Sequence, residues 1–148
     1  MDINRAAPAT AEHGLQVDAD PATVFSVVAD IDEWPSWNPD VRSVTREGPV
    51  EPGTVFRWRA GPSRLTSRLE VVDRPREITW TGTTMGIRAV HRFRFEPHDG
   101  GTLASSAESW EGLLPRVLKG YSRRTLSTGI ERVLAALKVE AERRASER

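Results

Sequence analysis

The stretch VDADPATVFSVVADIDEWPSWNPDV, residues 17–41, contains the signals that decide the fold. Asp20 is suited to the N-cap of a helix and Pro21 to its first position, and the apolar residues that follow recur at helical spacing. The next segment, DEWPSWN, has room for one short helical turn before Pro39 ends it. Two short helices are therefore expected before the periodicity of the chain changes.

The rest of the chain as far as residue 112 alternates in the manner of β-strands. The expected strands are EHGLQVDA before the two helices and, after them, DVRSVTRE, GTVFRWRA, SRLTSRLEVVD, EITWTGT, IRAVHRFRFEP and GTLASSAESWEG. Several of them carry arginine on one parity and apolar residues on the other. This pattern predicts an antiparallel sheet of seven strands with one face in solvent and one face covered.

The C-terminal region, from Leu114 to Arg144, carries apolar residues at helical spacing and predicts one long helix. Pro115 falls in the first turn of this helix, where proline is tolerated. The order of elements is thus strand, two short helices, six strands and a long helix, an α+β chain. We expect one domain over residues 11–148, preceded by a flexible arm over residues 1–10.

Composition narrows the classes of function. The chain has 21 basic and 21 acidic residues, so it lacks the overall charge expected of a nucleic-acid binder or of a domain held on anionic lipid, although a local basic face is compatible with this balance. No apolar run approaches the roughly 20 residues needed to span a bilayer. The absence of cysteine excludes disulfides and thiolate chemistry and fits a cytoplasmic protein. The sequence leaves a monomer and a homodimer equally open.

This order of elements resembles the helix-grip fold of the START-like superfamily (SRPBCC), which includes birch-pollen-allergen-like proteins, lipid-transfer domains and polyketide cyclase/dehydrase proteins. The resemblance extends from about residue 12 to residue 141, and its most specific parts are residues 17–41, GTVFRWR and VHRFRFEPHDGGT. It implies a curved antiparallel sheet wrapped around the C-terminal helix, with a cavity between them. It does not imply one activity, because members of such a superfold differ widely in function.

The resemblance places Trp34 and Trp37 where the short helices close one end of the sheet. There they either seal the core or contact a ligand, and both roles are compatible. Ser67 lies on the same strand parity as the expected wall residues. The expected apolar wall and its helix contribution are Phe56, Trp58, Leu65, Leu69, Ile78, Trp80, Phe93, Trp110, Leu118, Tyr121 and Thr125.

The turn HDGG makes a geometric prediction possible. With Asp99 and Gly100 as a two-residue hairpin loop, His91 faces Glu108 and Phe93 faces Ser106 across the strand pair, and both pairs point toward the cavity. A three-residue loop would instead shift Glu108 to the other face. A carboxylate beside the imidazole is expected to orient the ring and to raise the pKa of His91.

Three functions remain open at this point. The first is binding or transport of a small hydrophobic or aromatic molecule, lipid-like or polyketide-like. The second is a polyketide cyclase or dehydrase with His91, Glu108 and Tyr121 as acid/base groups. The third is a protein-interaction module whose core is filled. No metal site or cofactor is expected, since His13, His91 and His98 lack metal-ligand spacing and no phosphate-binding or dinucleotide-binding motif occurs.

Overall fold

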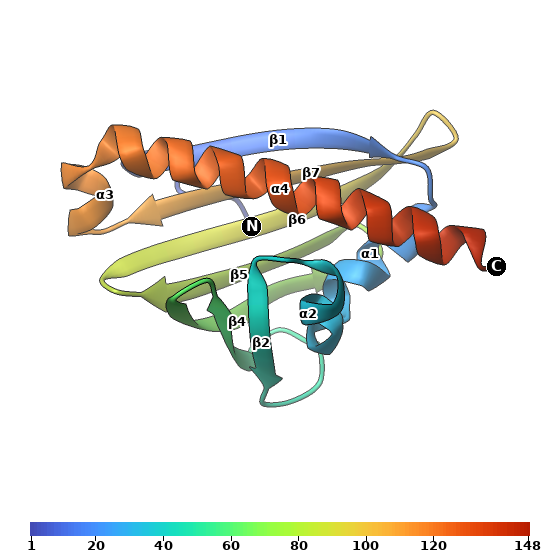
Figure 1. The fold of residues 1–148 in the computed structure, drawn as a ribbon, viewed down its shortest axis with the longest axis horizontal. Helices are drawn as coiled ribbons and strands as arrows, with labels where there is room; N and C mark the ends of the chain where they lie inside the picture. Colours follow the sequence, from blue (N-terminus) through green and yellow to red (C-terminus); the bar gives the residue numbers. More distant parts are fainter.

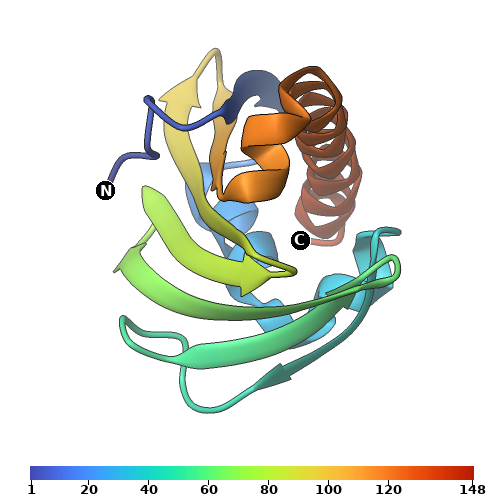
Figure 2. The ribbon, with the colours of Figure 1, turned by 90° about the vertical axis from the view of Figure 1, so that its left-hand side faces the viewer.

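A computed structural model describes residues 1–148 as a seven-stranded antiparallel sheet that curves around a long C-terminal helix (Figures 1 and 2). The elements are β1 (Ala9–Val17), α1 (Pro21–Ala29), the 3-10 turn η1 (Ile31–Glu33), α2 (Trp34–Trp37), β2 (Val41–Arg46), β3 (Val55–Ala60), β4 (Ser63–Asp73), β5 (Glu77–Thr84), β6 (Ile87–His98), β7 (Gly101–Glu111), α3 (Leu113–Val117) and α4 (Lys119–Ser146). The strand order is β1-β7-β6-β5-β4-β3-β2. This is the helix-grip architecture predicted from the sequence.

The signals at the start of α1 act as predicted. The carboxylate of Asp20 accepts a hydrogen bond of 2.8 Å from the backbone N–H of Thr23, and Pro21 occupies the first turn. This cap satisfies one of the N–H groups that a helix leaves without a partner at its N-terminus. α1 buries Val24 and Phe25 against the sheet, and the ring of Phe25 packs edge-on against Phe95 with centroids 5.9 Å apart.

The register of β6 and β7 is also as predicted. Asp99 and Gly100 both have positive φ, and His98 pairs with Gly101, so the loop contains two residues. This turn is favoured because its twist matches that of the flanking strands. It places His91 opposite Glu108 on the concave face.

The C-terminal region differs from the prediction of one continuous helix from Leu114 to Arg144. The helix is interrupted at Leu118, whose φ of −112° and ψ of 54° lie outside the helical region, and this residue separates α3 from α4. Gly120 lies two residues later, in the first turn of α4, and a glycine in a helix costs about 1 kcal/mol relative to alanine, so a continuous helix is weakly favoured here. The chain changes direction, and α3 lies beside the start of α4 (Figure 1).

The first residues, for which the sequence predicts a flexible arm, contact the outer face of the sheet in the structure. Ile3 is buried, the backbone N–H of Asn4 donates to the hydroxyl of Ser109 at 3.0 Å, and β1 already begins at Ala9. The physical cause is Arg92, whose side chain is 6% exposed on the outer face of the sheet and lies 2.7 Å from a carboxylate oxygen of Asp2. A buried guanidinium needs such partners; the N-terminal segment supplies one, and Glu12 of β1, at 2.9 Å, supplies the other.

We predict that Gly112→Ala destabilises the fold by about 2 kcal/mol or more. Gly112 has φ of 131°, and a Cβ at this position would lie 2.2 Å from the carbonyl oxygen of Gly86. Urea unfolding measures the change. The matched control is Gly129→Ala in α4, where a Cβ has open space; it should stabilise by about 1 kcal/mol. Equal stabilities of the Gly112→Ala variant and the parent would contradict the close approach of the two loops.

Candidate functional site

The concave face of the sheet, α2 and α4 enclose a cavity of about 460 Å³. Its volume is within the range of about 300–1,000 Å³ that is usual for small-molecule sites. Most of the predicted site residues line it: Trp34, Trp37, Trp58, Leu65, Ser67, Trp80, His91, Phe93, Glu108, Trp110, Tyr121 and Thr125. A cavity of this size does not fit the third function considered above, a protein-interaction module whose core is filled.

Five predicted site residues do not line the cavity. Phe56, Leu69 and Ile78 are fully buried in the core, because the sheet packs against the short helices at that end and leaves no space in front of them. Ser106 is buried behind His91. Leu118 lies at the interruption between α3 and α4 and is exposed.

Trp34 belongs to the core and to the cavity wall at once. Its side chain is buried, and its indole N–H donates to the carbonyl oxygen of Val28 at 2.9 Å. Its ring centroid lies 5.4 Å from that of Trp58 and 5.1 Å from that of Trp80. Trp37 is partly exposed and its buried indole N–H has no acceptor in the protein. The five tryptophans of the chain all line the cavity.

A row of small residues makes the hollow in the sheet. Ser67, Gly82 and Ala89 are neighbours in the ladder across β4, β5 and β6, and Trp110 continues the row on β7. A Cβ on Gly82 would lie 2.7 Å from the hydroxyl oxygen of Ser67, so glycine allows this approach. Glycine inside a strand often marks such a place. This inward-facing Gly82 is the sequence signal that our prediction overlooked.

Our prediction from the sequence also did not include the remaining residues that line the cavity. These residues come from the strands β2 to β6, from the loops that follow α2 and β5, and from the helices α1, α3 and α4: Val28, Asn38, Asp40, Val41, Ala60, Ser63, Gly82, Thr84, Met85, Ile87, Ala89, Leu114, Leu126, Gly129, Ile130 and Val133. The α4 residues follow Tyr121 and Thr125 at helical spacing, since positions four residues apart share one face. Periodicity could have found them once the cavity-facing side of α4 was fixed.

The polar groups of the cavity form two hydrogen-bonded groups, one around Glu108 and one between Trp58 and Ser67. The Nδ1 atom of His91 lies 3.2 Å from Oε1 of Glu108, and its Nε2 atom lies 2.7 Å from the hydroxyl of Ser106. Oε2 of Glu108 accepts a hydrogen bond of 2.7 Å from the indole N–H of Trp110. Trp58 donates in the same way to the hydroxyl of Ser67 at 3.0 Å. Glu108 therefore faces the cavity with its orientation fixed from two sides.

Burial lowers the pKa of His91 below its ordinary value of 6.5, and the negative charge of Glu108 opposes this effect only in part. Glu108 acts in the expected direction, but the expectation of a raised pKa was wrong, because the ring is removed from water and packs 4.6 Å from the ring of Phe93. At neutral pH the imidazole is uncharged. Ser106 and Glu108 then contact opposite ring nitrogens, which orients the neutral ring.

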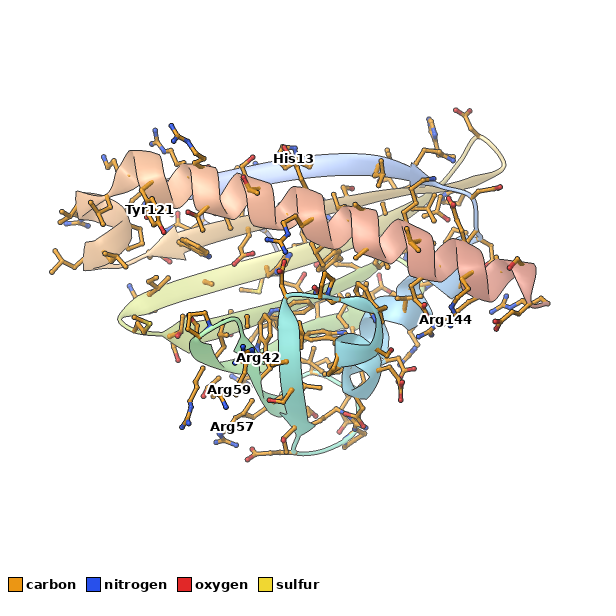
Figure 3. The ribbon with its side chains drawn as sticks, viewed as in Figure 1. His13, Arg42, Arg57, Arg59, Tyr121 and Arg144 are labelled. Carbon is orange, nitrogen blue, oxygen red and sulfur yellow. The ribbon has the colours of Figure 1, made fainter.

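Tyr121 does not join the His91–Glu108 pair. Its side chain is 70% exposed at the mouth, and its hydroxyl forms no hydrogen bond in the structure (Figure 3). Arg124, whose orientation the sequence left open, does not line the cavity. In fact no arginine or lysine lines it, although the chain has 21 of these residues. The alternation of the strands directs side chains such as Arg57 and Arg59 away from α4 (Figure 3).

The structure contains no group of three or more His, Cys, Asp or Glu side chains that could hold a metal ion. None of its helices combines the length and the apolar character that crossing a bilayer requires.

Fold and cavity together define a START-like helix-grip protein with a hollow interior. Residues 8–142 match the family described as polyketide cyclase / dehydrase and lipid transport, and the chain belongs to this family. A comparison of the sequence with curated proteins finds no match.

Solved structures share the fold at low sequence identity. A START superfamily protein from Mycobacterium smegmatis has a TM-score of 0.80 and 17% identity, with 90% of this chain and 97% of that chain covered. The Zhui aromatase/cyclase from a Streptomyces species has a TM-score of 0.76 and 20% identity, with 91% and 94% covered. The di-domain ARO/CYC protein StfQ, from the steffimycin biosynthetic pathway, has a TM-score of 0.77 and 20% identity, with 93% of this chain and 52% of that chain covered. At these identities the likeness establishes the fold alone.

We predict that the pKa of His91 lies below 6.5 and that Glu108→Gln lowers it further, since the variant removes the only charge that favours the protonated ring. The unfolded chain then binds this proton at higher pH than the folded chain. Because protonation of His91 then favours the unfolded chain, the free energy of unfolding decreases as the pH falls below 6.5. An NMR titration of the ring measures the pKa.

The control for this titration is Glu111→Gln on the same strand, whose carboxylate faces Arg88 on the outer side of the sheet. It should leave the pKa of His91 unchanged. A value above 6.5 in the parent protein would show that the charge of Glu108 outweighs burial.

Proposed function

We propose that this protein binds a small, uncharged, largely aromatic molecule in the cavity between the sheet and α4. The observation that supports the proposal most is the composition of the wall, which combines all five tryptophans with no basic side chain. Aromatic walls with a few fixed polar groups are typical of small-molecule sites. Membership of a family that includes cyclases, dehydrases and lipid-transport proteins supports the same class of ligand.

The charges of the cavity favour a neutral ligand over a carboxylate. Asp40 and Glu108 are the acidic residues of the lining, and Asp40 already contacts Arg132 at 2.6 Å. Glu108 has no cationic partner, because the buried His91 is neutral at neutral pH. A ligand carboxylate would lose its hydration and would gain no counter-ion in exchange, which costs free energy. Fatty acids and other free acids are thus poor candidates.

The fixed carboxylate of Glu108 also indicates how a ligand would be oriented. After accepting from Trp110, it retains acceptor capacity toward the cavity. A phenolic or alcoholic hydroxyl of the ligand can donate to it, and hydrogen bonds to a charged acceptor are stronger than those between neutral groups. We therefore propose a hydroxylated aromatic or polyketide-like ligand, with its hydroxyl at Glu108 and its rings against the tryptophans.

We predict that Gly129→Phe weakens binding of such a ligand at least tenfold, because the phenylalanine side chain would occupy the part of the cavity that the ligand needs. Gly129 lines the cavity, and a Cβ there meets no atom within 4 Å, so the variant should fold. Quenching of tryptophan fluorescence during titration with naphthol and with flavonoids measures the affinity.

The matched control is Gly120→Phe in the same helix, where a Cβ also has open space but which does not line the cavity. It should bind like the parent. Saturable binding that Gly129→Phe leaves unchanged would place the ligand outside the cavity.

Catalysis is a second candidate, and the His91–Glu108 pair is the observation that favours it. A cyclase or dehydrase must move a proton at a carbon or an oxygen of its substrate, and a partly buried carboxylate next to a neutral imidazole has groups able to do so. Loss of turnover of a poly-β-ketone analogue in Glu108→Gln, with the dissociation constant within about threefold of the parent, would assign catalysis. Binding without turnover in the parent would leave the carrier function alone.

A further inference from the structure

Large apolar side chains are exposed together around the mouth of the cavity. They are Met85, Leu113, Leu114, Val117, Leu118 and Tyr121, and we call them the apolar rim. Leu113 and Met85 are 75% and 78% exposed. Elsewhere only Met1 and Val139 are exposed to a similar degree among large apolar residues. An exposed apolar cluster of this kind marks an interaction surface.

The apolar rim is one continuous feature, although its residues come from two parts of the chain. The β5–β6 turn carries Met85, and α3 begins directly beside this turn, because Gly112 approaches the backbone of Gly86. Both segments lie at the same end of the molecule (Figures 1 and 2). Leu114, Tyr121 and Met85 also line the cavity, so the rim continues into the proposed binding site.

The charged residues of the segment that carries most of the apolar rim, residues 112–130, are all basic. Arg116, Lys119, Arg123 and Arg124 lie in or beside α3 and the first turns of α4, and no acidic residue occurs between Glu111 and Glu131. None of these four side chains forms a salt bridge, whereas basic residues elsewhere, such as Arg57 and Arg132, pair with carboxylates. Although the net charge of the whole chain is zero, the surface beside the apolar rim is therefore basic.

We infer that the apolar rim docks on the surface of an anionic lipid bilayer, with the mouth of the cavity toward the lipid. Exposed leucine and aromatic side chains among lysine and arginine are what such a surface binds: the apolar groups enter the acyl boundary and the basic groups contact lipid phosphates. A second copy of this chain fits less well, because a two-fold contact through the rim would bring Lys119 and Arg124 of both copies together.

Docking of this kind gives an apolar molecule a path between the bilayer and the cavity that avoids water. This consequence rests on the proposed function, but the docking itself does not. Gly129→Phe, which blocks the cavity, should therefore still bind membranes. Loss of ligand binding and loss of docking are separate results.

Sedimentation with vesicles of phosphatidylcholine, alone and in an equimolar mixture with phosphatidylglycerol, tests the inference on the complete chain. We expect binding to the mixed vesicles only, and we expect it to decrease as salt is added. Lys119→Ala and Arg124→Ala should each weaken it about fivefold, the equivalent of about 1 kcal/mol per basic residue at an anionic surface. The double variant Leu113→Ser/Val117→Ser should weaken it at least tenfold.

The matched control is Val139→Ser, which removes an equally exposed apolar side chain from α4 outside the rim. It should bind vesicles like the parent, and circular dichroism should show that all variants are folded. The inference is wrong if neither kind of vesicle binds the parent, or if the double variant binds as well as the parent does. A dimer in sedimentation velocity that the double variant dissociates would assign the rim to self-association and would also overturn it.

Discussion

The structure depends on how Trp34 is held between the short helices and the sheet. Its indole N–H is satisfied by the carbonyl of Val28, and its ring packs edge-on against Phe56 at 5.5 Å. The side chain of Trp34 thus closes the end of the concave face next to the short helices, so side chains of α4 are not needed to fill that end. The space that remains between α4 and the aromatic wall is the cavity. Because interiors are normally packed without such voids, a retained hollow points to an occupant.

The elements that local chemistry specifies could be predicted from the sequence. The cap formed by Asp20 and the two-residue turn at Asp99 and Gly100 each allow few backbone conformations, so they fixed the start of α1 and the pairing of His91 with Glu108. The alternation of the strands likewise separated the outward-facing arginines from the inward-facing aromatic residues. These are short-range constraints, and the sequence states them directly.

The features that depend on tertiary packing could not be predicted. Whether Phe56 faces a cavity or a filled core depends on how closely the short helices approach the sheet, which no local pattern encodes. The pKa of His91 depends on a balance between burial and the charge of Glu108, and its direction follows only from the packing of the ring. The interruption at Leu118, which exposes α3 at the mouth, is likewise a result of how the chain packs after β7.

The measurement that tests the central claim most directly is a calorimetric titration with a matched pair of ligands, naphthol and naphthoate. They share the aromatic frame and differ in charge, so their affinities compare the same apolar contacts with and without a carboxylate. A cavity lined by tryptophans and by Glu108, without a basic residue, should bind naphthol saturably and naphthoate at least tenfold more weakly. Equal or stronger binding of naphthoate would contradict the account, because it would require a cationic partner that the cavity wall does not contain.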